Sequence, residues 1–81
     1  MKKKILVFGS GSVGAHHAHA ARTLNANVFI TDINFEQLAY FKNKLYPMRY
    51  LKWDKEIRIV NYKDVFNNAQ KYDLIILGVS P

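Results

Sequence analysis

Three glycines near the N-terminus have the spacing that holds a phosphate group against a protein backbone. Gly9, Gly11 and Gly14 form the pattern Gly-x-Gly-x-x-Gly directly after the apolar run of residues 4–8. In this pattern the first glycine permits a tight turn after a strand, and the second lets a phosphate approach the backbone. The third lets the following helix pack closely against the strand. The spacing therefore predicts a turn that binds the pyrophosphate of a dinucleotide.

The residues between the glycines supply hydrogen-bond donors to such an anion. The N–H groups of the first helical turn, around Ser12 and Val13, face it at the positive end of the helix dipole. Ser10 and Ser12 lie in the same turn, and we expect their hydroxyl groups to donate to the pyrophosphate rather than to act as nucleophiles. Glycine-rich turns also occur as ordinary strand-to-helix connections, so the surrounding elements must distinguish the two interpretations.

An acidic residue follows at the distance expected for a ribose ligand. Asp32 comes 18 residues after Gly14 and ends the β-branched and aromatic run of residues 28–31. A carboxylate at this place accepts hydrogen bonds from a ribose 2′-hydroxyl and repels a 2′-phosphate. Ile33 and Asn34 follow it, and neither is an arginine, so the sequence predicts NAD rather than NADP. The alternative is that Asp32 is only a cap or turn residue that opens the next helix.

The segments that must position these residues alternate between strand-like and helix-like patterns. We expect strands at residues 4–8, 28–31, 57–60 and 73–78, and helices at residues 12–24, 34–45 and 64–70. The second helix should end before Tyr46-Pro47, because a residue before proline disfavours the helical conformation. Residues 46–54 are then a connection packed by aromatic side chains. The alternation predicts an α/β, Rossmann-like parallel sheet in the order 3-2-1-4, with helices on both faces.

The predicted strand order places a crevice between the carboxyl ends of the first and fourth strands, where ligands of such sheets bind. Gly78, Val79, Ser80 and Pro81 follow the fourth strand, and we expect them to form a ledge near the nicotinamide-side ribose. The alternative is that they only end the strand. The fourth strand is expected to be an exposed apolar edge. We therefore expect self-association through it, and interpret residues 1–81 as the N-terminal part of an incomplete dinucleotide-binding domain.

The composition argues against several other functions. The chain of 81 residues is one domain at most, and it contains no cysteine for a disulfide or a cysteine metal site. It has neither a signal peptide nor an apolar stretch of the roughly 20 residues that span a membrane, so a cytoplasmic protein is expected. The net charge of +6 comes from dispersed lysines and arginines, with one run at Lys2–Lys4. This dispersal favours a solvated surface over a nucleic-acid interface.

Two further groups of side chains have an ordinary structural interpretation. His16 and His19 share a helix face, but no third metal ligand of suitable spacing is evident, so surface or packing histidines are expected. Tyr46, Tyr50 and Trp53 could stack on bases, but we expect them to anchor the connection between two elements.

The chain resembles the N-terminal part of Gfo/Idh/MocA-type oxidoreductases at residues 4–14, at Asp32 and at residues 72–81. The resemblance implies a domain that binds NAD or NADP in an enzyme acting on a sugar or related alcohol. Ser80-Pro81 fits the ending of that family's fourth strand. The family's catalytic lysine lies in a Glu-Lys-Pro motif that this chain lacks, so no catalytic residue is assigned and hydride transfer by these 81 residues alone is not expected. The alternative is a regulatory domain of the potassium-transport type, which binds NAD or another adenine nucleotide without catalysis.

Overall fold

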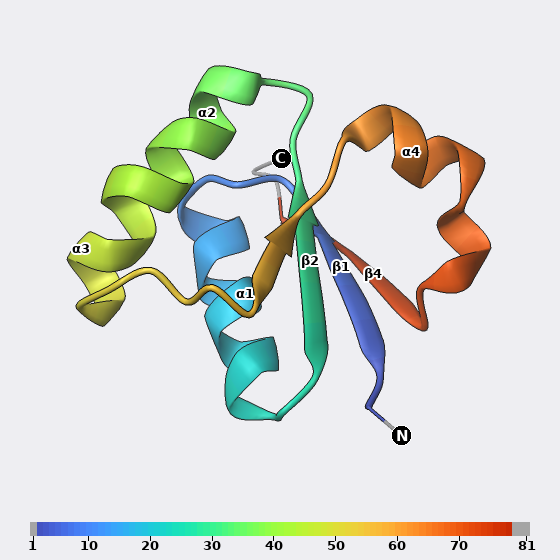
Figure 1. The fold of residues 1–81 in the computed structure, drawn as a ribbon, viewed down its shortest axis with the longest axis horizontal. Helices are drawn as coiled ribbons and strands as arrows, with labels where there is room; N and C mark the ends of the chain where they lie inside the picture. Colours follow the sequence, from blue (N-terminus) through green and yellow to red (C-terminus); the bar gives the residue numbers. More distant parts are fainter. Residues whose placement is uncertain (1, 79–81) are drawn as a thin grey trace.

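The computed structural model describes residues 2–78, which form a parallel sheet between helices (Figure 1). The four strands in this range are parallel and lie in the order β3-β2-β1-β4, which confirms the predicted Rossmann-like α/β fold. The elements, in chain order, are β1 (Lys4–Phe8), α1 (Ser12–Thr23), β2 (Asn27–Thr31), α2 (Phe35–Tyr40), the π-helical turn η1 (Phe41–Leu45), α3 (Tyr46–Tyr50), β3 (Ile57–Ile59), α4 (Tyr62–Asn67), the 3-10 turn η2 (Ala69–Lys71) and β4 (Leu74–Leu77).

Successive residues of each strand point to opposite faces of the sheet, so the sheet has a hydrophobic core on both sides. Figure 1 shows α1, α2 and α3 on one side of the sheet and α4 on the other. On the first side, Val7, Val28 and Ile30 belong to one buried cluster with α1 and with Phe41 of η1. On the second side, the smaller cluster consists of Leu6, Val65 and Tyr72, with Phe29 and Val60 packed against it. The main core therefore supports the helix that follows the glycine-rich turn.

The helix after β2 is longer than the sequence predicts. Asn34 caps α2 as expected, because its side chain accepts a hydrogen bond from the Gln37 N–H at 3.1 Å. The predicted end before Tyr46-Pro47 is wrong, since the helical path continues through η1 and α3. Pro47 cannot donate to a carbonyl of the preceding turn, and the π-helical turn η1 changes the hydrogen-bond pattern directly before it. The path ends instead at Leu51, where φ is 78°.

The helix before β4 is shorter than the sequence predicts and begins earlier. Asn61 caps it, with its side chain accepting from the Lys63 N–H at 2.9 Å, and the helix ends at Asn67. Val65 is buried, as expected for an inward-facing residue. A helix over residues 64–70 with its apolar side chains on the sheet predicts that Phe66 and Ala69 also face inward, but both are exposed. Phe66 follows Val65 directly and lies about 100° further round the helix, and Ala69 lies beyond α4 in η2, so neither shares the buried position of Val65.

Strand β4 lies at the edge of the described sheet and pairs with β1 on one side. Its apolar side chains are largely uncovered, with Leu74 51% and Leu77 70% exposed. The exposed apolar edge that the sequence predicts is therefore present, and self-association through it stays a prediction. Among the helices of residues 2–78, none is both long and apolar enough to cross a membrane.

Candidate functional site

The glycine-rich turn joins β1 to α1 at the carboxyl end of the sheet. Gly9 has a φ of 116°, a conformation that residues with a Cβ atom rarely adopt, and its N–H donates to the Thr31 carbonyl at 2.8 Å. A Cβ atom on Gly14 would lie 1.9 Å from the Gly9 carbonyl oxygen, whereas one on Gly11 would have no heavy atom within 4 Å. The fold therefore requires glycine at positions 9 and 14, and Gly11 leaves open space beside the turn.

The N-terminus of α1 is free to bind an anion. Gly11 is its N-cap and has no side chain to accept from the first N–H groups, and the first turn contains no acidic residue. The Ala15 N–H donates to the Gly11 carbonyl at 2.8 Å, so the N–H groups before it have no acceptor within the helix. These groups and the helix dipole stabilise a negative charge at Ser12 and Val13.

Asp32 follows β2, and its half-buried carboxylate is hydrogen-bonded to the glycine-rich turn. Its Oδ2 accepts from the N–H of Ser10 at 2.9 Å and from the Ser10 hydroxyl at 2.8 Å. Its Oδ1 accepts from the Asn34 N–H at 3.0 Å. Asp32 therefore orders the turn before α2, as a turn residue would, and it also lies against the glycine-rich turn, where a ribose ligand is expected. The sequence predicts that the Ser10 hydroxyl donates to the pyrophosphate. In the structure this hydroxyl donates to Asp32, so it is not a free donor.

The predicted site residues meet around one cavity of about 280 Å³ at the topological switch point. Gly14 does not line this cavity, and Gly78 packs against Gly14, since a Cβ atom on Gly78 would lie 2.8 Å from the Gly14 Cα. Gly78 is thus a close-packing residue as well as part of the cavity wall. Val79, Ser80 and Pro81, which were expected to form the ledge, lie outside the described residues. The cavity is lined by Gly9, Ser10, Gly11, Ser12, Val13, Asp32, Gln37 and Gly78.

Two residues that the sequence pattern did not assign to the site also reach it. Gln37 donates from Nε2 to the Ser10 carbonyl at 3.0 Å, and Arg49 donates from Nη1 to the Ser12 carbonyl at 3.0 Å and from Nη2 to the Ser12 hydroxyl. The sequence could have indicated Gln37, because this residue stands three residues after the cap Asn34, close to where the chain leaves β2. Nothing in the sequence indicates a role for Arg49, because it lies on α3, a helix that the sequence does not predict.

An aromatic cluster holds α3 against α1. The ring of His19 stacks on Tyr50 with centroids 3.7 Å apart, and its Nδ1 is 3.1 Å from the Tyr46 hydroxyl. Arg22 pairs with Asp54 at 2.7 Å just beyond α3. Burial and then the nearby Asp54 carboxylate raise the pKa of Tyr46 to about 12. Burial acts to raise the pKa of Asp54, but hydrogen bonds, that from Arg22 above all, lower it below its usual value. His19 is thus a packing residue, and the aromatic side chains anchor the segment as expected.

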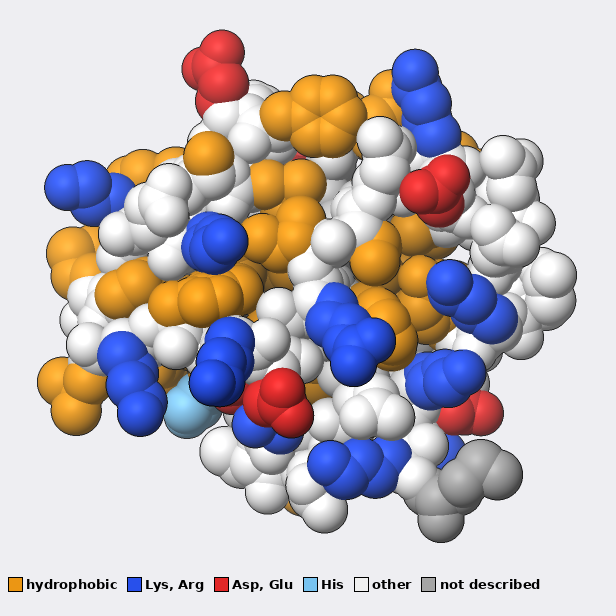
Figure 2. Space-filling model, in the orientation of Figure 1, with side chains coloured by type: hydrophobic (Ala, Val, Ile, Leu, Met, Phe, Trp, Pro, Cys, Tyr) orange, Lys and Arg blue, Asp and Glu red, His pale blue; other side chains and the backbone are white. Residues whose placement is uncertain are grey.

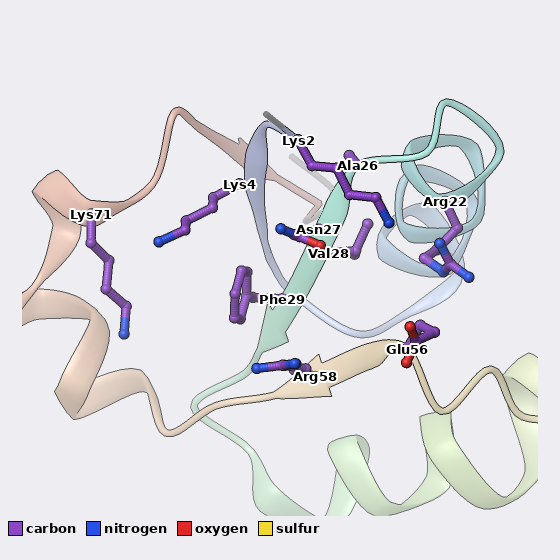
Figure 3. A pocket seen from close by; sticks show the side chains of 10 residues that line it. All are labelled: Lys2, Lys4, Arg22, Ala26, Asn27, Val28, Phe29, Glu56, Arg58 and Lys71. Carbon is purple, nitrogen blue, oxygen red and sulfur yellow. The ribbon is translucent and has the colours of Figure 1, made fainter.

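The opposite, amino end of the sheet carries a basic cavity. Figure 2 shows lysine and arginine side chains spread over one face of the molecule, with acidic side chains among them. In Figure 3, Lys4, Arg58 and Lys71 lie on the same side as the ring of Phe29. The fold therefore gathers cations that are dispersed in the sequence, and β1 and β2 separate them from the glycine-rich turn. This cavity of about 300 Å³ is lined by Lys2, Lys4, Arg22, Ala26, Asn27, Val28, Phe29, Glu56, Arg58 and Lys71.

Comparison with known proteins agrees with a dinucleotide-binding domain. The family described as alanine dehydrogenase/PNT, C-terminal domain, matches residues 1–80. No curated protein matches the chain. The family match supports the nucleotide-binding part of the resemblance noted above, and it does not specifically support the Gfo/Idh/MocA family. Domains of the matched family bind NAD(P). The chain therefore belongs to the alanine dehydrogenase/PNT C-terminal domain family, whose members are NAD(P)-binding domains with a Rossmann-type fold.

Proposed function

We propose that this chain binds NAD at the carboxyl end of its sheet. The pyrophosphate would lie on the N-terminus of α1, and the adenosine ribose would lie on Asp32. One observation carries the proposal: the open helix N-terminus, the uncrowded side of Gly11 and the Asp32 carboxylate border the same cavity. An anion and a hydroxyl-bearing sugar would find their complementary groups within that cavity.

The hydrogen bonds and the negative charge of Asp32 support NAD in preference to NADP. A carboxylate offers about four acceptor positions, and Ser10 and Asn34 occupy three of them, so Oδ1 keeps capacity for a ribose hydroxyl. The same negative charge would repel a 2′-phosphate. Arg49 donates to Ser12, and no contact between Arg49 and Asp32 is present among the described residues.

The chain's own residues would bind and orient the cofactor. NAD, when bound, supplies a hydride acceptor; the N-terminus of α1 would hold its pyrophosphate and Asp32 its ribose. The sugar oxidoreductase activity that the Gfo/Idh/MocA resemblance implies depends in part on Ser80-Pro81, and these two residues lie outside the described range.

Titration calorimetry with NAD and NADP tests this function. We expect the wild-type protein to bind NAD more tightly than NADP. Asp32→Ala should weaken NAD binding about tenfold, which is the scale of one lost hydrogen bond to a charged group. It should weaken NADP binding less, because the repulsion of the 2′-phosphate disappears with the carboxylate. Asp32→Asn keeps an oxygen that can accept from Ser10, so it should disturb the glycine-rich turn less. It should still reduce the ratio of the NAD affinity to the NADP affinity, because it removes the negative charge.

Asp64→Ala is the matched control, because Asp64 is an exposed acid in the first turn of α4. It should leave both affinities unchanged. Equal losses for NAD and NADP in the Asp32 variants would refute the role of Asp32 in ribose binding. A wild-type protein that binds neither dinucleotide would refute the proposed function itself.

A further inference from the structure

Arg49 brings a positive charge to the edge of the proposed pyrophosphate site from a distant part of the chain. It lies 37 residues after Ser12, and its guanidinium donates to both the carbonyl and the hydroxyl oxygen of that residue. Ser12 is the first residue of α1 and lines the cavity. The guanidinium therefore stands beside the helix terminus at which the phosphate is proposed to bind.

The electrostatics of this placement favour an anion as the missing partner. Cations are stabilised at the C-terminus of a helix and not at its N-terminus, where the dipole is positive. Arg49 nevertheless lies at the N-terminus of α1, whose first turn contains no acidic residue. Within residues 2–78, no carboxylate forms an ion pair with Arg49. The potential at the N-terminus of α1 is thus positive, because the helix dipole, the free N–H groups and the guanidinium all contribute to it.

The guanidinium also keeps donors for a ligand. Arginine has five N–H donors in a planar fork that matches the oxygens of a phosphate, and the contacts with Ser12 use two of them. Arg49 is exposed, so the remaining donors face solvent. The Ser12 contacts fix the position of the fork without exhausting it.

The fold holds Arg49 in this position through the aromatic cluster on its own helix. Tyr46 and Tyr50 flank Arg49 on α3, and both contact His19 of α1, Tyr50 by stacking and Tyr46 by its hydroxyl. Tyr46 is only 2% exposed and also packs on Trp53. The anchored helix fixes the backbone of Arg49, and the hydrogen bonds to Ser12 restrain its guanidinium, so less freedom is lost when a phosphate binds.

We infer that Arg49 is a phosphate-binding residue of the dinucleotide site and contacts the pyrophosphate together with the N-terminus of α1. This inference rests on the proposed function, because it assigns Arg49 a ligand in that same site. It extends the site from the strand ends and the glycine-rich turn to α3, an element on which the glycine pattern gives no information.

Calorimetric titration with three probes, NAD, ADP and adenosine, tests this assignment. NAD and ADP carry a pyrophosphate and adenosine does not. Arg49→Gln should weaken NAD and ADP binding about tenfold and leave adenosine binding within twofold of wild type, because only the phosphate contact is lost. The dependence of the ADP affinity on salt concentration should also become shallower, since one cation fewer meets the phosphates. Arg49→Lys keeps the charge without the fork and should fall between wild type and Arg49→Gln.

Arg58→Gln is the matched control, because it makes the same change of charge in β3, at the basic cavity on the other end of the sheet. It should bind all three probes like wild type. Circular dichroism of each variant shows whether it is folded, and if Arg49→Gln is not, the selective loss of ADP is read from Arg49→Lys.

Three results would overturn the assignment of Arg49. These are unchanged ADP affinity in the folded Arg49 variants, an equal loss for adenosine, or an equal loss in Arg58→Gln. In the first two the wild-type protein still binds NAD and nothing moves the site, so the proposed function stands. An equal loss in Arg58→Gln would also count against the proposed place of the dinucleotide at the carboxyl end of the sheet. If the wild-type protein binds neither NAD nor ADP, the proposed function and the role of Arg49 fail together.

Discussion

At the scale of single residues, Gly11 and Gly14 have different roles in the same turn. Gly14→Ala would place a methyl group 1.9 Å from the backbone oxygen of Gly9, so the turn or α1 must move. We expect this variant to be destabilised by about 3 kcal/mol, in the range of severe packing and strain defects. Gly11→Ala meets no heavy atom within 4 Å, so its stability should change by less than about 1 kcal/mol.

Urea unfolding and NAD titration of the two variants separate these roles. Gly11→Ala should stay folded and bind NAD at least tenfold more weakly, because its methyl group occupies the space through which a phosphate approaches. Comparable stability of the two variants would contradict the close approach of Gly14 to the Gly9 carbonyl oxygen. Unchanged NAD affinity in Gly11→Ala would contradict the place assigned to the pyrophosphate.

The sequence predicts site residues well where their role depends on spacing along the chain. Gly9, Gly14 and Asp32 stand at fixed distances from a strand, so the spacing alone predicts that the turn and the acid lie together. The acceptor of the Ser10 hydroxyl could not be predicted, because it depends on how closely Asp32 approaches the turn. Arg49 could not be predicted either, because nothing near it in the sequence indicates that its helix returns to Ser12.

At the scale of elements, the segment from α2 to α3 shows where sequence patterns mislead. The cap at Asn34 predicted the start of the helix correctly. Of the apolar side chains expected on its buried face, Leu38 and Phe41 are buried, whereas Phe35 is 58% exposed. Pro47 predicted an end that does not occur, because the π-helical turn η1 and the burial of Tyr46 together favour continuation. Local preference was outweighed by packing against His19 of α1, which is far away in the sequence, and against Trp53, which follows α3.

The burial of Tyr46 predicts that this packing weakens at alkaline pH. Its pKa is raised to about 12 in the folded protein, mainly by burial, against an ordinary value of about 10. Between these two values the unfolded chain loses the proton and the folded protein keeps it, so the free energy of unfolding falls as the pH rises. The contribution is fully present below about pH 10 and is lost as the pH passes about 12, a total on the order of 3 kcal/mol.

Urea unfolding at pH 8, 10 and 11 measures this effect as the difference between wild type and Tyr46→Phe. The difference in the free energy of unfolding should shrink as the pH rises, since phenylalanine has no proton to lose. Tyr40→Phe is the control, because Tyr40 is 48% exposed and its removal should leave the alkaline loss of stability unchanged. A difference between wild type and Tyr46→Phe that does not vary with pH would show that Tyr46 is not buried in solution as it is in the structure.

The strands were easier to predict than the helix on the second face. Strands β1, β2 and β4 each centre on a short apolar run between polar turns, the pattern of parallel strands covered by helices, and β3 places Ile57 and Ile59 around Arg58. The segment before β4 has three candidate inward-facing residues, Val65, Phe66 and Ala69, and only Val65 is buried. A short helix followed by a 3-10 turn breaks the helical period, so the spacing of apolar residues no longer shows which side faces the sheet.

At the scale of the whole molecule, the two ends of the sheet present different surfaces for anions. The carboxyl end carries the cavity with Gly11 and Asp32, which follows directly from the strand order and could be predicted from the sequence. The amino end carries the basic cavity with Arg58 and Lys71, which come together only in the folded protein. Calorimetry of the wild-type protein cannot tell which end a negatively charged dinucleotide occupies. The place where NAD binds therefore has to be tested as well as the binding itself.

A titration of the ¹⁵N-labelled protein with NAD, followed by amide chemical shifts, tests that claim most directly. The N–H groups of Gly11, Ser12 and Val13 should show the largest changes, with a further change at Asp32, because they surround the proposed pyrophosphate and ribose positions. Amides of Arg58 and Lys71 should change little. The account is contradicted if NAD shifts the amides of Arg58 and Lys71 and leaves those of the glycine-rich turn unchanged.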